Sequence, residues 1–120
     1  MRDEGVLIVG SGLTYHNMQG FGRDSSTRDA ESFTRYLNDA IALKDTRARD
    51  EKLLHWESAP HARLAHPRED HLLPLLASAG ASGGDLGHIL FAENVMKIPM
   101  TSYAFGNIGI AQAMASERVK

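Results

Sequence analysis

Histidines and carboxylates gather in one stretch, 59–80, of this 120-residue chain. Glu69 and Asp70 lie there, directly before His71, and an earlier polar stretch carries His16. The histidines of the 59–80 stretch are His61, His66 and His71. Imidazoles and carboxylates without cysteine suit a nitrogen- and oxygen-ligated metal such as zinc, iron(II) or manganese. We predict that His16 and His71 meet in space and that the rest of the chain positions them.

The spacing within this cluster restricts how it can work. His66 and His71 are five residues apart, which is not the four-residue spacing of the helical zinc-protease motif. Two side chains five apart do not share one helix face, so they converge only if His66 lies outside a helix. A simpler alternative is that the histidines and acids only cap a helix, and that His16 is a solvated loop residue.

Composition excludes several classes of protein. The chain is 42% apolar, has a net charge of −2 and contains no cysteine. These values predict one globular domain over residues 1–120, with no nucleic-acid partner, no disulfide and no thiolate nucleophile. No run approaches the roughly 20 apolar residues of a membrane span. The expected location is therefore cytoplasmic, with no membrane association.

A short apolar run, 6–9, opens the chain and ends at a glycine pair around Ser11. Such a run is typical of a strand buried on both faces of a parallel sheet. The polar loop that follows, 11–28, would leave the carboxyl end of this strand, where ligands bind in open α/β sheets. A dinucleotide fingerprint is not supported, because Tyr15 stands where its third glycine is required.

The remaining pattern predicts helices first and strands later. Apolar residues at three- and four-residue spacing predict a helix over 29–44. Further predicted elements are a helix over 45–58 capped by Asp45, a helix over 70–79 capped by Asp70 and ended by Gly80, strands over 88–92 and 100–105, and a short helix over 108–115. Asp70 as the cap would leave Pro74 in the first turn, where its missing N–H costs little. The predicted fold class is α/β, with a mixed, largely parallel sheet flanked by helices.

Three segments together resemble a known family. Residues 11–17 read Ser-Gly-Leu-Thr-Tyr-His-Asn, residues 65–76 read Ala-His-Pro-Arg-Glu-Asp-His-Leu-Leu-Pro-Leu-Leu, and residues 99–106 read Pro-Met-Thr-Ser-Tyr-Ala-Phe-Gly. They resemble the SGxxxHN, HPxxxHxxPLL and SMxSYxFG segments of the class III extradiol ring-cleavage dioxygenases, the LigB-like enzymes, in their DOPA-type branch. Their order and spacing are similar to those of the C-terminal half of the family.

The resemblance implies an activity and a role for each motif residue. The family inserts both atoms of O2 into a catecholic ring at a non-haem iron(II), with zinc sometimes found in its place. His16 matches the acid/base histidine, and His71 matches the third metal ligand. The other implied roles are outer-shell support for His66, Glu69 and Asp70, and substrate binding for Asn17 and Tyr103. The implied partners are a catecholic substrate and O2.

The family's two other metal histidines precede the segment at which this chain begins, and His55, His61 and His88 match no ligand position. The chain is then expected to be a C-terminal fragment, a truncated homologue, or one half of a site completed by another polypeptide. It would form a homo-oligomer or bind a chain that supplies the missing half. Two alternatives stay open: an inactive, self-associating or partner-binding module, and a zinc hydrolase on a similar α/β scaffold.

Overall fold

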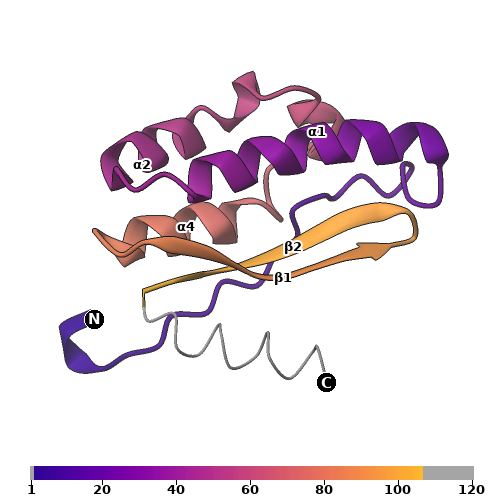
Figure 1. Ribbon diagram of the computed structural model, residues 1–120. Coiled ribbons are helices and arrows are strands. Elements are labelled where there is room, and N and C mark those ends of the chain that lie inside the picture. The colour runs from indigo at the N-terminus through magenta and orange to yellow at the C-terminus, as the bar shows by residue number, and fades with distance from the viewer. Residues whose placement is uncertain (1, 107–120) are drawn as a thin grey trace.

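The computed structural model describes residues 2–106 and places a layer of helices on one face of a β-hairpin (Figure 1). Helices α1 (Asp24–Ile41) and α4 (Leu73–Ser82) both contact the hairpin, and α2 (Thr46–Leu54) packs against both of these helices. The N-terminal segment, which includes the short helix η1 (Arg2–Glu4), begins beyond the hairpin and then passes close to α4, where Gly10 lies against Pro74 and Ser78 (Figure 1). No helix within residues 2–106 is long and apolar enough to cross a membrane.

Helix α1 confirms the predicted amphipathic helix but begins five residues earlier, at Asp24. Its buried face carries the predicted stripe, including Phe33, Leu37 and Ile41. Asp24 forms an ion pair with Lys97 at 2.8 Å, and Thr27 Oγ1 donates a hydrogen bond to the Lys97 carbonyl oxygen at 2.7 Å. These contacts hold the polar first turn against the hairpin, which apolar periodicity cannot indicate.

The region predicted as a single helix over 45–58 forms two short helices, and a third follows it. The first, α2, begins as predicted, because the Asp45 carboxylate accepts hydrogen bonds from the backbone N–H groups of Arg47 and Ala48. It ends at Leu54. The second is the 3-10 helix η2 (Trp56–Ser58), and the third is α3 (Ala62–Ala65), which was not predicted.

Helix α4 is shifted by three residues relative to the prediction. Asp70 is not its cap: the helix begins at Leu73, and the Glu69 carbonyl oxygen accepts the N–H groups of Leu72 and Leu73 in a turn that precedes it. Pro74 lies in the first turn, as predicted, where helices tolerate proline. The helix continues past Gly80 and ends at Ser82, where Gly83 takes the positive φ of 60°.

The sheet consists of β1 (Gly87–Val95) and β2 (Ile98–Phe105), which cover both strands predicted in this region and extend them. They pair in antiparallel register from Gly87 opposite Phe105 to Val95 opposite Ile98, with an irregularity between Ile89 and Phe91. The two turn residues, Met96 and Lys97, both have positive φ values, 49° and 71°, as two-residue hairpin turns require. The helix predicted over 108–115 lies outside the described residues.

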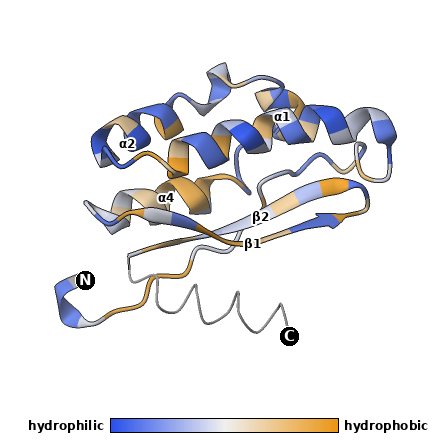
Figure 2. Cartoon of the chain, viewed as in Figure 1, coloured by the Kyte–Doolittle hydropathy of each residue, from blue (hydrophilic) through white to orange (hydrophobic). Residues whose placement is uncertain are grey.

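The prediction of a largely parallel sheet is wrong for residues 2–106, whose sheet has two antiparallel strands. Residues 6–9, predicted as a buried strand, are extended but belong to no strand, and Leu7 and Val9 are 83% and 77% exposed. Figure 2 shows this hydrophobic run along the N-terminal segment. An apolar run becomes a buried strand only when neighbouring strands pair with it, and residues 2–106 supply none.

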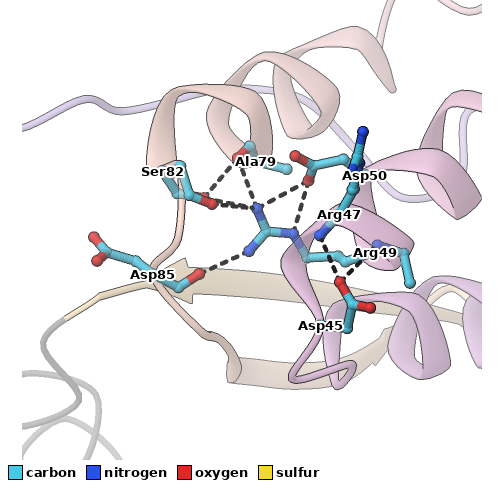
Figure 3. A network of polar contacts seen from close by, with 9 residues as sticks. Asp45, Arg47, Arg49, Asp50, Ala79, Ser82 and Asp85 are labelled. Atoms are coloured by element: carbon cyan, nitrogen blue, oxygen red, sulfur yellow. Dashed lines mark hydrogen bonds and ion pairs between the residues drawn. The ribbon is translucent and has the colours of Figure 1, made fainter.

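One buried cation joins α2 to the end of α4 (Figure 3). The Arg49 side chain is fully buried. Its guanidinium donates to the carbonyl oxygens of Ala79, Gly83 and Asp85, to Ser82 Oγ and to the Asp50 carboxylate, over distances of 2.7–3.1 Å. The carbonyl groups at a helix end have no partner within the helix, so a cation placed there both satisfies and attracts them. Arg49 therefore fixes the helix whose other end follows His71.

Candidate functional site

The rings of His16 and His71 lie against each other, with centroids 3.6 Å apart and planes inclined by 25°. The structure thus brings together the two residues that the sequence analysis paired. His16 is half-buried in the loop after the extended N-terminal segment. His71 is exposed, in the turn that leads into α4, above the fully buried Leu72. The pair is therefore accessible to a ligand while its backbone is anchored in the core.

Three hydrogen bonds hold the two loops together. The N–H of Leu13 donates to the His71 carbonyl oxygen at 2.8 Å, and the N–H of His16 donates to the Ala65 carbonyl oxygen at 2.8 Å. Between them, His66 Nε2 lies 3.0 Å from the Thr14 carbonyl oxygen. The loop also approaches α4 closely at Gly12, where a side chain would collide with the His71 carbonyl oxygen. Glycine permits this close approach because it has no Cβ.

His66 itself is a core residue. Its side chain is fully buried and meets the rings of Phe33 and Trp56 edge-on, at centroid distances of 5.5 and 6.2 Å. Burial lowers the pKa of His66 below its usual range, since desolvation disfavours the imidazolium. A carbonyl oxygen only accepts hydrogen bonds, so the neutral ring carries its proton on Nε2 and donates it to Thr14.

The two acidic residues predicted to support a ligand take different places. Glu69 pairs with Arg63 at 3.0 Å, and this hydrogen bond lowers the pKa of the Glu69 carboxyl group. Arg63 also pairs with Glu57 and covers the ring of Trp56. The Glu69 carboxylate is thus turned toward a guanidinium rather than toward an imidazole. Asp70 is exposed beside the histidine pair.

Two hollows meet at His71. The smaller, about 320 Å³, is lined by His16, Asn17, Met18, Pro67, Arg68, Asp70 and His71. The larger, about 620 Å³, lies between the N-terminal segment, α4 and the hairpin, and it is mostly apolar. Cavities of this size accommodate small organic molecules. His71 therefore lines both hollows.

The two residues predicted to bind substrate fall in different hollows. The Asn17 side chain lines the smaller hollow, but backbone groups hold its amide. Its Nδ2 donates to the Leu64 carbonyl oxygen at 2.9 Å, and its Oδ1 accepts the Gln19 N–H at 3.2 Å. Tyr103 lines the apolar cavity, and its hydroxyl donates to Asn38 Oδ1 at 2.6 Å. Burial raises the pKa of Tyr103, so its hydroxyl stays protonated.

The described residues do not make a complete metal site. Within residues 2–106, no group of three or more His, Cys, Asp or Glu side chains is placed to hold a metal ion. His16 and His71 supply two imidazoles, whereas catalytic metal sites usually use three protein ligands. A metal bound here would need donors from outside this range.

Sequence reasoning missed the residues that support the pair. Arg49 belongs to the charged run 47–52, which by its pattern is most simply a solvated face, yet its side chain is fully buried. No local signal marks Arg49, because its partners Ala79, Ser82, Gly83 and Asp85 lie 30–36 residues further along the chain. Arg63, to which the sequence gave no role, covers the ring of Trp56. Helix α3, which carries Ala65 and leads to His66, gave no periodic signal because it has four residues.

An accessible pair of stacked imidazoles beside two hollows is a site suited to proton transfer or to part of a metal centre. The chain is similar to two dioxygenases. It is 36% identical over 86 residues to the 4,5-DOPA dioxygenase extradiol of Beta vulgaris, covering 69% of this chain and 31% of that protein. It is 35% identical over 77 residues to a 4,5-DOPA dioxygenase extradiol-like protein of Schizosaccharomyces pombe, covering 62% of this chain and 26% of that protein.

The chain thus spans between a quarter and a third of the length of these two relatives. No protein-family profile matches it. The relatives support a link to the extradiol dioxygenases over short regions.

Proposed function

We propose that this chain is the C-terminal portion of a class III extradiol ring-cleavage dioxygenase of the DOPA-type branch, with residues 1–120 forming a single domain of that enzyme. The names of both relatives support the activity, and the three motif segments support the branch. The observation that carries the proposal is the 3.6 Å stacking of His16 on His71. Two motif histidines separated by more than fifty residues come together at one accessible pocket.

In this proposal His71 is a metal ligand and His16 is the acid/base. The half-buried His16 ring faces a pocket large enough for part of a catechol, so its free nitrogen would accept a proton from a catechol hydroxyl. Imidazole suits this task because it changes charge near neutral pH. The apolar cavity beyond His71 would accommodate the ring, with Tyr103 in its wall.

The proposed metal is iron(II), for which zinc is the competing occupant. Iron(II) would supply the activation of O2 when bound. His71 would be one of its donors, and the other donors would come from outside residues 2–106, either from further residues of a longer chain or from a partner polypeptide. A cytoplasmic location belongs to the same proposal.

The first experiment measures metal and catechol binding by the chain as it exists. Anaerobic titration with iron(II) and then 4-nitrocatechol should change the absorbance of the catechol, because a base and a metal both favour its ionised form. His71→Ala should abolish the change in catechol absorbance that requires iron(II). His16→Ala should reduce the change that results from loss of the catechol proton to His16. His55→Ala is the matched control, since His55 lies at the end of α2 and contacts its own helix.

Air is then admitted and the ring-cleavage product is measured by its visible absorbance. Equal catechol responses in the protein with His71→Ala and in the unaltered protein would contradict the proposed ligand role. Stoichiometric zinc with ester hydrolysis, and no response to catechols, would replace the dioxygenase by a hydrolase.

A second candidate function is a self-associating or partner-binding module without catalysis. The exposed apolar run at 6–9 favours it, because extended apolar segments pair readily with other chains. The same experiment separates the two: a metal-free protein that ignores catechols and sediments as an oligomer would support the module. Replacing Leu7 and Val9 by Lys should then yield a monomer.

A further inference from the structure

His66 presents a problem that its position in the core does not explain. The ring is fully buried among aromatic side chains, yet its Nδ1 has no hydrogen-bond partner within residues 2–106. A buried polar atom left unpaired destabilises a fold, and an apolar residue of similar shape would avoid that penalty. The ring must therefore contribute something that an apolar side chain cannot.

That contribution is the hydrogen bond from Nε2 to the Thr14 carbonyl oxygen, at 3.0 Å. The backbone N–H of His66 cannot make it, because it already donates to the Ala62 carbonyl oxygen at 2.9 Å. Thr14 is itself buried, and its hydroxyl accepts the Thr101 N–H of β2 at 3.2 Å. The carbonyl is thus fixed between the hairpin and the His66 ring.

The carbonyl of Thr14 lies two residues before His16. On either side of it, backbone hydrogen bonds join Leu13 to His71 and His16 to Ala65. The His66 ring supplies the middle of these three links. Without it, the Thr14 carbonyl oxygen loses this donor, and between the Leu13 and His16 links the loop is held only through the Thr14 hydroxyl. The backbone that carries the His16 ring is then less constrained.

We propose that His66 is a positioning residue whose Nε2–H holds the Thr14 carbonyl and thereby keeps the His16 imidazole on His71. It acts on the proton-transfer histidine through the loop backbone and does not serve the metal ligand. The functional meaning of this role rests on the proposed function, but the positioning itself does not.

The test compares His66→Gln with His66→Asn. The glutamine amide reaches the place of Nε2 and retains a donor for Thr14, whereas the shorter asparagine cannot reach it. Inter-ring nuclear Overhauser effects between His16 and His71 report the stacking directly. We expect these effects in the unaltered protein and in His66→Gln, and their loss in His66→Asn, while far-UV circular dichroism shows that all three are folded. His55→Gln should change nothing.

Persistence of the inter-ring effects in His66→Asn would overturn the proposal, and so would their equal loss in His66→Gln. A measurement on the unaltered protein covers the case in which a variant does not fold. Nitrogen-15 shifts must place the His66 proton on Nε2, protected from exchange, and a proton on Nδ1 would refute the hydrogen bond. Neither readout needs metal or substrate, so a failure to cleave catechols would leave this inference standing.

Discussion

Removing the buried guanidinium of Arg49 should destabilise the fold by about 2–4 kcal/mol. The guanidinium reaches three carbonyl oxygens, Ser82 Oγ and Asp50 (Figure 3). Not all of these would be left unpaired in Arg49→Met. Ser82 Oγ also donates to the Ala79 carbonyl oxygen at 2.6 Å, and Asp50 is 40% exposed and returns to water.

The carbonyl oxygens of Gly83 and Asp85 remain as the groups that lose their cation. Each lost hydrogen bond to a charged group costs about 1.5–3 kcal/mol, and water reduces this cost here because Gly83 is exposed and Asp85 is half-buried. Replacing both members of a buried ion pair by apolar residues can be neutral, but here the partners are backbone groups that no substitution removes. Loss of the hydrogen bonds to Gly83 and Asp85 therefore lowers the free energy of unfolding by about 2–4 kcal/mol.

Urea unfolding followed by circular dichroism measures this change. Arg49→Lys should fall between Arg49→Met and the unaltered protein, because an ammonium group keeps the charge but cannot span all five acceptors. Arg47→Met is the control on the same helix, with an exposed side chain and an expected change within about 0.5 kcal/mol. A similarly small change for Arg49→Met would refute the view that Arg49 fixes the end of α4.

Three further predictions concern other parts of the structure. Leu72→Ala should cost about 2–5 kcal/mol in the same assay, because Leu72 is fully buried beneath the turn that carries His71. Met96→Asn should stabilise the protein by about 0.5–1 kcal/mol, since asparagine tolerates the positive φ of 49° better than methionine; a loss of stability would contradict the turn geometry. Burial lowers the pKa of His66, so the unfolded chain binds a proton on this ring more readily than the folded protein does. The free energy of unfolding should therefore fall as the pH drops below the ordinary pKa of 6.5, and His66→Gln should make this fall less steep.

Several elements could be predicted from local pattern alone. The apolar stripe of α1 and the Asp45 cap each involve residues within one element. The pairing of His16 with His71 was also predicted, from the motif segments that carry them. The roles assigned to these residues stay predictions.

Other features depended on residues far apart in the sequence. Residues 6–9 have the pattern of a buried strand, but a strand is completed by its neighbours, which its own sequence does not encode. The close approach of Gly12 to the His71 carbonyl oxygen likewise joins two distant segments.

The sequence by itself determined which residues are candidates for chemistry and the apolar period of α1, because both depend on residue type and short-range spacing. Only the tertiary structure decided which polar groups are buried. His66 and Arg49 are charged or polar residues that enter the core because distant carbonyl oxygens accept their hydrogen bonds. Those acceptors come together through packing, so no local pattern reveals them.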